Sequence, residues 1–449
     1  MSERFDAVVL GMGPAGEAAA SRLLGQGLKV AVVERELIGG ECAYWACIPS
    51  KTLLRAPEVR AEARRVAGVS EPEQRWRELV DYRDYMIRHL DDSAQVSGYE
   101  KRGATVVKGE ARFQGPGRLE AGGRVLEADR IIVATGSEPR IPPIDGLEQA
   151  GYWTNRQATT VTELPESVVV LGGGPVGLEL GQFFRRMGAA VTLVETAERL
   201  IPREEPAISE RIHKALQEDG IDVRLGAVVE RAQLRGGKRV LQLADGSQVE
   251  GQELIIATGR SPRVDDLGLQ SVGAKARPEG IVIDERCRAA DGVWAIGDVT
   301  GVMPFTHVGT YQGRIAAGDI AGRTVRADYS AIPRVVFSDP EIAAVGLTSE
   351  QARERGIDVA AAHVALADAI ARPWTFEQDP RGDLGVLVDR KRDVLVGAWA
   401  LAPLASEWIH YAALAIKAQI PVEVLADTVA QFPTYSEGYR MAIERLERD

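Results

Sequence analysis

The chain has 449 residues, of which 45% are hydrophobic and 27% are charged, and its net charge is -11. This length exceeds what one hydrophobic core supports, so we expect two to four domains of a soluble globular protein. The acidic balance argues against a nucleic-acid partner. No run of 18 apolar residues occurs, so no membrane partner is expected. Three cysteines do not make a secreted disulfide scaffold, and a cytoplasmic location is predicted.

The N-terminal region has the order of elements of a dinucleotide-binding unit. A predicted strand at 7–10 leads into a glycine-rich turn and a helix, which favours a folded domain over a signal peptide. A second strand ends in Glu34, 23 residues after the first glycine, and a later strand at 131–136 closes on Thr-Gly. Such glycines let the backbone approach a pyrophosphate, and the acid binds a ribose. The glycines of the turn are Gly11, Gly13 and Gly16.

The same order of elements recurs in the middle of the chain. A strand at 168–171 precedes Gly172, Gly174 and Gly177, the next strand is followed by Glu195 at the same spacing, and a strand at 254–259 again closes on Thr-Gly. We call each glycine-rich turn with its strand-end acid a cradle. Two cradles predict two bound dinucleotides. A carboxylate at position 195 favours NADH over NADPH because it binds a free 2′-hydroxyl and repels a 2′-phosphate. The nearby Arg199 could partly compensate for that repulsion.

A cysteine pair follows the first cradle, in the run Gly39-Gly40-Glu41-Cys42-Ala43-Tyr44-Trp45-Ala46-Cys47-Ile48-Pro49-Ser50-Lys51. In a straight helix, Cys42 and Cys47 would have Cα atoms about 8–9 Å apart, beyond the ~7 Å limit of a disulfide. A bridge therefore requires a break in the helix, and we expect a helix to begin near Pro49. Lys51 and the helix N-terminus would favour thiolate. The alternatives are inert buried cysteines or half of a metal site. We predict no metal site, because Cys287 lies far away and no histidine cluster accompanies the pair.

The rest of the chain predicts two further kinds of structure. Residues 56–99 are expected to be helical and 109–129 to form a small antiparallel sheet, with another strand at 292–298. From residue 329 onward, strands at 335–337 and 385–388 alternate with helices at 349–355 and 405–418, which indicates an α+β domain.

These motifs together resemble the class I pyridine nucleotide-disulfide oxidoreductases, which include dihydrolipoamide dehydrogenase, glutathione reductase and mercuric reductase. The motifs are GMGPAG with Glu34, GGECAYWACIPSK, ATGSEP, LGGGPVGLELG with Glu195, ATGRSP, WAIGD and FPTYSE, and the resemblance covers essentially the whole chain. It implies an α/β fold of two three-layer Rossmann-like domains and an α+β C-terminal dimerisation domain. The implied domains are an FAD-binding domain at 1–152 and 263–328, an NAD(P)-binding domain at 153–262 and a dimerisation domain at 329–449.

The resemblance also implies roles for individual residues. Cys47 is expected to be the charge-transfer thiolate beside the flavin, and Cys42 the interchange thiol that meets the acceptor. Lys51 is expected to pair with Glu179. The expected FAD-binding residues are Gly11, Gly13, Pro14, Ala15, Gly16, Glu34, Gly40, Lys51, Thr135, Gly136, Gly297 and Asp298. The expected NAD-binding residues are Gly172, Gly174, Pro175, Val176, Gly177, Glu195 and Gly259.

The C-terminal motif departs from the family pattern. Relatives carry His-Pro-Thr-x-x-Glu, in which the histidine is the acid/base, whereas this chain has Phe432, with Glu437 retained as a catalytic candidate. Tyr435 is a candidate proton donor. An aromatic acceptor pocket formed by Phe432, Tyr44, Trp45 and Tyr435 is an alternative to plain packing roles for these residues.

Three functions remain open at this point. The first is an NAD(P)H-dependent FAD enzyme that reduces a disulfide, with a small molecule or small thiol compound as acceptor and a homodimer as its form. The second is an NAD(P)H dehydrogenase that reduces a quinone or another non-disulfide acceptor. The third is a redox-sensing flavoprotein. A mercuric reductase is disfavoured because the C-terminus lacks cysteines.

Overall fold

The computed structural model describes residues 3–446, and these form two compact units. The first unit takes the described residues up to Ser50 together with Asp81–Arg140 and Gly259–Asp328. The second takes Lys51–Val80, Ile141–Thr258 and the described residues from Tyr329 onward. Helix α3 (Cys47–Arg65) begins in the first unit and continues in the second. Among residues 3–446, no helix is both long and apolar enough to cross a membrane.

A six-stranded sheet forms the centre of the first unit, in the order β20-β21-β8-β2-β3-β4. All neighbours pair in parallel except β20, which runs antiparallel at the edge. Strand β2 lies between β8 and β3, so the chain leaves the centre of the sheet at the glycine-rich turn. The strand bounds are β2 (Ala7–Leu10), β3 (Val30–Glu34), β4 (Thr105–Lys108), β8 (Ile131–Val133), β20 (Arg288–Ala290) and β21 (Val293–Ala295).

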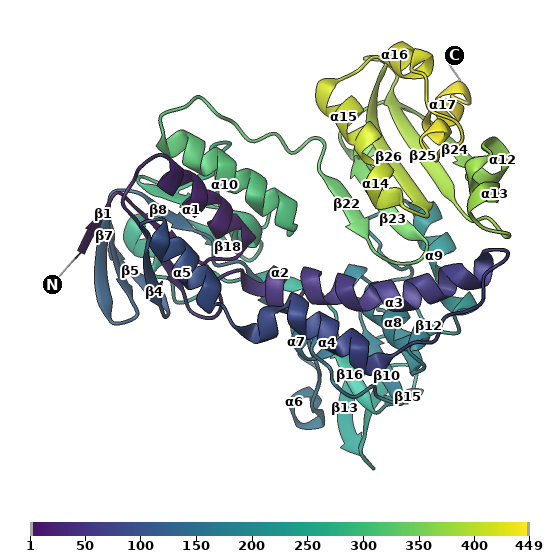
Figure 1. Cartoon of the computed structure of the whole chain (residues 1–449), viewed down its shortest axis with the longest axis horizontal. Coiled ribbons are helices and arrows are strands. Elements are labelled where there is room, and N and C mark those ends of the chain that lie inside the picture. Colours follow the sequence, from purple (N-terminus) through teal and green to yellow (C-terminus); the bar gives the residue numbers. More distant parts are fainter. Residues whose placement is uncertain (1–2, 447–449) are drawn as a thin grey trace. The chain divides into compact units, whose positions relative to one another are not determined.

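The two faces of this sheet are covered differently because successive side chains of a strand point to opposite faces. Val9 and Val32 pack under helices α1 (Pro14–Gly25) and α10 (Thr306–Ile320), which lie side by side (Figure 1). Val8 and Val33 pack against a second sheet, in the order β1-β7-β6-β5. The unit is therefore a three-layer sandwich, as predicted. The bounds of the second sheet are β1 (Glu3–Phe5), β5 (Ala111–Gly115), β6 (Arg118–Ala121) and β7 (Arg124–Ala128).

The remaining elements of the first unit are short, except for α5. The helical segments are α2 (Gly40–Tyr44), η1 (Arg88–Leu90), α5 (Ser93–Lys101), η2 (Leu269–Val272) and η3 (Gly297–Thr300). The strands are β9 (Ser137–Pro139), β17 (Arg260–Pro262), β18 (Ala276–Arg277) and β19 (Gly280–Ile281). The Asp81 to Met86 end of α4 (Trp76–Met86) also belongs to this unit.

The second unit repeats the first arrangement on a smaller scale. A parallel sheet in the order β12-β11-β10-β16 again places the strand before the glycine-rich turn at its centre. Helices α8 (Pro175–Arg186) and α9 (Pro206–Glu218) cover one face. The antiparallel sheet β13-β14-β15 covers the other. The bounds are β10 (Ser167–Leu171), β11 (Ala190–Val194), β12 (Asp222–Arg224), β13 (Val229–Arg235), β14 (Lys238–Leu243), β15 (Gln248–Gly251), β16 (Glu253–Ile256), α6 (Leu147–Ala150) and α7 (Asn155–Thr159).

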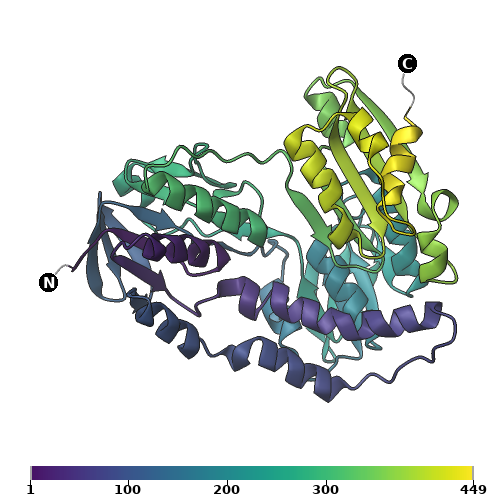
Figure 2. The ribbon, with the colours of Figure 1, turned by 45° about the horizontal axis from the view of Figure 1, so that its top comes forward.

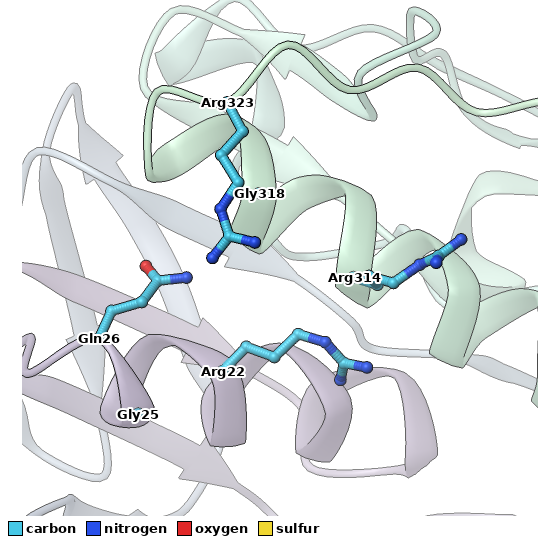
Figure 3. A pocket seen from close by; sticks show the side chains of 6 residues that line it. All are labelled: Arg22, Gly25, Gln26, Arg314, Gly318 and Arg323. Atoms are coloured by element: carbon cyan, nitrogen blue, oxygen red, sulfur yellow. The ribbon is translucent and has the colours of Figure 1, made fainter.

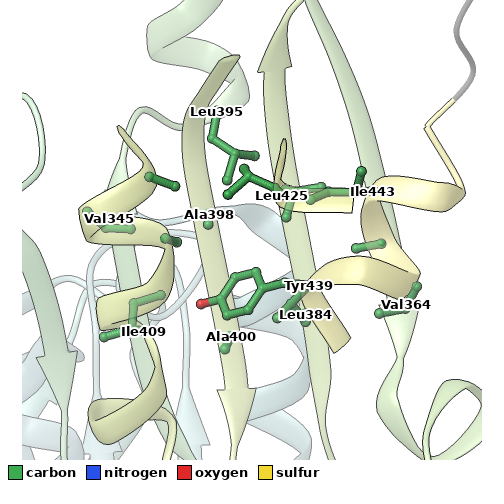
Figure 4. Close-up of a cluster of buried hydrophobic side chains, with 14 of the residues drawn as sticks. Val345, Val364, Leu384, Leu395, Ala398, Ala400, Ile409, Leu425, Tyr439 and Ile443 are labelled. Atoms are coloured by element: carbon green, nitrogen blue, oxygen red, sulfur yellow. The ribbon is translucent and has the colours of Figure 1, made fainter. Parts of the chain in front are cut away.

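The C-terminal part of the second unit is an antiparallel sheet, β22-β23-β26-β25-β24, with helices on one face (Figure 2). Tyr439 and Ile443 of α17 (Glu437–Glu444) pack on the sheet there, beside Leu384 and Val364 (Figure 4). Val336 and Leu401 on the opposite face join the core around α8 and α9. The bounds are β22 (Pro333–Val336), β23 (Glu341–Gly346), α11 (Ser349–Glu354), β24 (Val359–Ala365), α12 (Leu366–Ala369), α13 (Arg372–Phe376), β25 (Asp383–Asp389), β26 (Val394–Ala402), α14 (Ala405–Trp408), α15 (His410–Ala418) and α16 (Val422–Asp427).

Several element boundaries differ from the sequence prediction, including those of two helices. The helix expected over 405–418 is divided at Ile409 into α14 and α15. The helix expected to begin near Pro49 begins two residues earlier, at Cys47, which places that cysteine in its first turn.

Candidate active site

The two glycine-rich turns have the same geometry. Gly11 has φ +95°, and a Cβ there would lie 2.3 Å from the carbonyl oxygen of Ala134. Gly172 has φ +117°, and a Cβ there would lie 2.4 Å from the same atom of Ala257. Both positions are closed to any side chain by the Thr-Gly strand beside them. The internal repeat seen in the sequence is therefore a repeat of backbone geometry.

Each turn leaves room for a ligand at its second glycine. A Cβ at Gly174 would meet nothing within 4 Å, and one at Gly13 would meet only the Cα of Gly40, at 4.0 Å. These glycines cap α1 and α8, each of which begins with a proline, Pro14 or Pro175. A helix N-terminus with adjacent open backbone fits a pyrophosphate. The residues present thus fit the two predicted dinucleotides, with Ala15 and Val176 in the first helical turns.

The acids at the strand ends are held in matching positions. Glu34 accepts hydrogen bonds from the backbone N–H groups of Met12 and Glu36, both at 2.8 Å. Glu195 accepts hydrogen bonds from the N–H of Gly173 at 2.6 Å and of Ala197 at 2.8 Å. Two backbone N–H groups fix the orientation of each carboxylate beside the turn, the Thr196 hydroxyl adds a third bond to Glu195 at 3.1 Å, and a carboxylate retains further lone pairs for ribose hydroxyls.

The segments after the two Thr-Gly turns meet. Strand β9, after Gly136, pairs antiparallel with β17, after Gly259. Thr135 donates its hydroxyl to the carbonyl of Arg263 at 2.8 Å. Ser137 at the start of β9 donates to Asp298 at 2.6 Å. The predicted flavin-side acid, Asp298, is therefore oriented by a serine inside the ATGSEP motif.

The cysteine pair lies on two helices separated by a break. Cys42 belongs to α2 and Cys47 to α3, and Trp45 between them has φ -135° and ψ -4°, which is not helical. The spacing of a straight helix therefore does not apply to the pair. Both cysteines are partly buried, and their side chains hydrogen-bond to each other. The Thr306 hydroxyl lies 3.2 Å from Cys42 Sγ and 3.5 Å from Cys47 Sγ.

The electrostatics distinguish the two thiols. The hydrogen bond with Cys47 raises the pKa of Cys42, and burial and the negative charge of Cys47 raise it further. The hydrogen bond from Thr306 lowers the pKa of Cys42, but its effect is smaller than the effects that raise it. A negative charge on Cys47 thus opposes ionisation of Cys42. The arrangement is compatible with a thiolate at position 47 and a thiol at position 42.

Lys51 lies one helical turn after Cys47, on α3. Its Nζ is 2.6 Å from Glu179 Oε2 on α8, and it lies 4.9 Å from the centre of the Phe337 ring. Glu179 is buried, with 8% of its side chain exposed, and also accepts the N–H of Phe337 at 3.0 Å. The pair anticipated between Lys51 and Glu179 is thus formed, with the carboxylate fixed at both oxygens.

The residues of the C-terminal motif differ in their exposure to solvent. Phe432 is 75% exposed, whereas Tyr435 is buried and packs against Trp408 and Phe376. Burial raises the pKa of Tyr435, and its hydroxyl hydrogen-bonds to nothing among residues 3–446. This burial argues against the proton-donor role considered from the sequence. The Glu437 carboxylate accepts a hydrogen bond from the backbone N–H of Thr434 at 3.1 Å and so stabilises the turn that follows Phe432.

The aromatic acceptor pocket also loses Tyr44. That ring is fully buried, its hydroxyl donates to the carbonyl of Ile38 at 3.1 Å, and Arg88 lies over its face. Tyr44 and Tyr435 each belong to the interior of their own unit, and Phe432 and Trp45 remain as the accessible members. The burial of Tyr44 and Tyr435 favours packing roles for these two rings, which was the alternative to the pocket.

A further cavity of about 350 Å³ lies between α1 and α10, away from the cradle (Figure 3). It is lined at the C-terminal halves of the two helices and just beyond them, whereas Gly13 and Thr306 stand at their N-terminal ends. The cavity is therefore separate from the dithiol. Its lining residues are Arg22, Gly25, Gln26, Arg314, Gly318 and Arg323.

Comparison with known proteins decides the family. Residues 5–313 match the pyridine nucleotide-disulphide oxidoreductase family, and residues 332–443 match the dimerisation domain of that family. The chain belongs to the pyridine nucleotide-disulphide oxidoreductase family. Members of this family use FAD and a pyridine nucleotide, and this chain is an FAD-dependent NAD(P)H oxidoreductase of the kind that acts on disulfides or related acceptors.

Relatives within the pyridine nucleotide-disulphide oxidoreductases cover the whole chain. A mercuric reductase from Lysinibacillus sphaericus is 33% identical over 100% of this chain and 83% of its own length. A dihydrolipoyl dehydrogenase from Thermus scotoductus is 35% identical over 99% of this chain and 98% of its own. The structure of the Cu(II) complex of HOCl-induced flavoprotein disulfide reductase RclA from Escherichia coli aligns with a TM-score of 0.88, at 28% identity, over 98% of this chain and 100% of that one.

Sequence reasoning missed three residues of the site. Thr306 stands in no recognisable motif, and its contacts span 259 and 264 residues. Ser137 lies inside the ATGSEP motif, directly after the predicted FAD-binding residue Gly136, so its position in that motif could have indicated a place in the site. Phe337 lies at the end of a predicted strand, but nothing in the sequence indicates that it would contact Lys51.

Proposed function

We propose that this chain is a homodimeric NADH-dependent reductase of a small disulfide, in which Cys42 attacks the acceptor and Cys47 holds the thiolate next to the flavin. The observation that carries the proposal is the pair of cysteines at the break between α2 and α3, hydrogen-bonded to each other and within reach of one hydroxyl. Inert structural cysteines have no need for such a contact.

The thiol chemistry starts from a reduced pair carrying one proton, with a thiol at Cys42 and a thiolate at Cys47. FAD held at the first cradle would supply hydride acceptance from the nicotinamide and two-electron reduction of the Cys42–Cys47 disulfide. Cys42 then loses its proton and attacks one sulfur of the acceptor, which forms a mixed disulfide and releases one thiolate. Cys47 attacks Cys42 Sγ, restores the internal disulfide and releases the second thiolate. The two released thiolates take up protons.

The choice of NADH is supported at the second cradle. The Glu195 carboxylate is fixed beside the turn by two backbone N–H groups and would repel a 2′-phosphate. The guanidinium of Arg199 is bound to the carbonyls of Glu204 and Pro202 and to the Ser209 hydroxyl. Because those three groups already occupy the guanidinium, we infer that Arg199 does not serve as the partner of a 2′-phosphate.

The homodimer is supported by the dimerisation-domain match and by the surface of the C-terminal part. Val429, Phe432 and Leu414 there are 93%, 75% and 64% exposed. Large apolar side chains in such positions are typical of a protein interface. In the family this domain completes the partner's active site, which would place Phe432 near a dithiol. We also propose a cytoplasmic location, where thiols stay reduced.

An acceptor screen with cysteine variants tests this function. Purified enzyme reconstituted with FAD is assayed with NADH against small disulfides, including lipoamide and glutathione disulfide. We expect turnover with at least one disulfide and its loss, by a factor of a hundred or more, in both Cys42→Ser and Cys47→Ser. Cys287→Ser is the matched control and should retain wild-type turnover. Equal disulfide turnover in wild type and Cys42→Ser would refute the proposal.

The second candidate is an NAD(P)H dehydrogenase for a quinone or another non-disulfide acceptor. It is favoured by Phe432, because a phenyl ring transfers no proton and a positioned acid/base is typically worth about 10²–10⁴-fold. Quinone turnover that survives Cys42→Ser, with no disulfide turnover in the wild type, would establish this candidate.

A further inference from the structure

The hydroxyl of Thr306 lies within hydrogen-bonding distance of both redox sulfurs. Thr306 is the first residue of α10, a helix of 15 residues. Its Oγ1 is 3.2 Å from Cys42 Sγ and 3.5 Å from Cys47 Sγ. A hydroxyl has one hydrogen to donate and two lone pairs to accept with. It can therefore donate to whichever sulfur is charged. The hydroxyl of Thr310, one turn further along α10, instead donates to the backbone carbonyl of Thr306.

We infer that Thr306 is a catalytic residue, whose hydroxyl stabilises the thiolate on either cysteine and so lets the pair exchange its proton internally. This inference rests on the proposed function. Before Cys42 can attack, the proton on Cys42 Sγ must leave, and Cys47 Sγ, already hydrogen-bonded to it, accepts that proton. The Thr306 hydrogen turns from Cys47 Sγ to Cys42 Sγ as the charge moves. No electron moves in this step, and no external base is needed.

The same proton serves the next step. It passes from Cys47 to the thiolate released from the acceptor, and Cys47, charged again, attacks Cys42 Sγ. The Thr306 hydrogen follows the charge back. The chain thereby retains a route for the proton although Phe432 stands where relatives carry a histidine. A hydroxyl shared by both sulfurs is what this route requires.

Other charged groups near the pair are already engaged. Glu41, next to Cys42, faces Arg260 at 3.9 Å and Arg263 at 4.0 Å. Lys51, one turn beyond Cys47, is paired with Glu179. His307 follows Thr306 on α10, and its ring stacks on Phe305. A substitution of Thr306 leaves these side chains in the sequence. A change in the thiol pKa of such a variant therefore reports the contribution of the Thr306 hydroxyl.

The test measures thiolate formation without NADH or an acceptor. FAD-loaded enzyme is reduced chemically, and alkylation of Cys42 and Cys47 by iodoacetamide is followed by mass spectrometry across pH, with buried Cys287 as an internal reference. Thr306→Val keeps the shape and removes the hydroxyl, Thr306→Ser keeps the hydroxyl, and Thr310→Val is the matched control. We expect the first thiol pKa to rise by about one unit in Thr306→Val, a tenfold loss of thiolate near neutral pH. Thr306→Ser and Thr310→Val should titrate like wild type.

Steady-state kinetics give the second readout. We expect Thr306→Val to lower disulfide turnover about tenfold or more at neutral pH and to recover part of it at higher pH, as a thiolate-forming role requires. A Thr306→Val enzyme with the wild-type titration curve would overturn the inference. Failure of the proposed function is distinguishable, because it would appear in the wild type as absence of NADH-driven disulfide turnover while the alkylation titration still reports on Thr306.

Discussion

Replacing Asp339 with asparagine removes the charge that anchors the far end of α3, the helix that begins at Cys47. Asp339 is 9% exposed and faces three guanidiniums, with Arg65 Nη1 at 2.9 Å, Arg186 Nη1 at 2.9 Å and Arg381 Nη2 at 3.0 Å. Burial alone would raise the pKa of this carboxyl, but the three guanidiniums outweigh burial and lower the pKa to about 2. Arg65 is the last residue of α3.

The size of the effect follows from that pKa. A shift from the ordinary value of 3.8 to about 2 corresponds to about 2 kcal/mol of stability at neutral pH. Removing one partner of a buried ion cluster also leaves the guanidiniums uncompensated, so Asp339→Asn is expected to cost about 2–4 kcal/mol. Because the folded pKa is depressed, this stability is fully present above the unfolded pKa and is lost as the pH falls toward 2.

Thermal unfolding followed by circular dichroism measures the change. We expect the Tm of Asp339→Asn to fall by about 2–4 °C at pH 7, with the same difference at pH 5 and a smaller one below pH 4. The control is Asp129→Asn, which breaks an exposed bond to Arg4 at 2.9 Å and should cost under about 1 kcal/mol. Equal Tm values for the two variants, or a difference that grows as the pH falls, would refute the reasoning.

Three further predictions concern the cofactor and acceptor sites. Phe432→His should raise lipoamide or glutathione-disulfide turnover by about tenfold or more, because it restores an acid/base beside Glu437; no gain in kcat/KM would mean that the pocket shape excludes these disulfides. Glu195→Ala should reduce the NADH preference over NADPH by about tenfold, measured as the ratio of kcat/KM values; a wild-type enzyme that prefers NADPH tenfold would contradict the assignment. Glu34→Ala should lower the FAD content of purified protein, read from the ratio of visible to ultraviolet absorbance, whereas a full flavin content would show that this carboxylate does not hold the ribose.

Local motifs made the two cradles predictable from the sequence. The spacing from Gly11 to Glu34 and from Gly172 to Glu195 encodes a strand, a turn and a helix, so the geometry repeats when the spacing does. The pairing of Lys51 with Glu179 was accessible only through the family resemblance, because the two residues are separated by 128 positions and each alone has an ordinary role.

The residues that the sequence could not place depend on tertiary packing. Thr306 acquires its contacts from the way α10 begins beside α2, which no local pattern records. Tyr435 and Phe432 lie three residues apart in a turn, where no periodicity indicates which ring is buried, and the structure buries only Tyr435. Asp339 likewise shows no motif, since its arginine partners come from α3, α8 and the segment before β25.

The most direct test of the central claim is an anaerobic titration of the FAD-loaded enzyme with NADH, followed by visible absorbance. We predict a long-wavelength charge-transfer band after one equivalent, which arises from the Cys47 thiolate beside oxidised flavin, and its absence in Cys47→Ser. Cys42→Ser should show the band without NADH, because Cys47 is then free to ionise. Direct bleaching of the flavin by the first equivalent, with no such band in the wild type, would mean that electrons do not settle on the cysteine pair and would contradict the account.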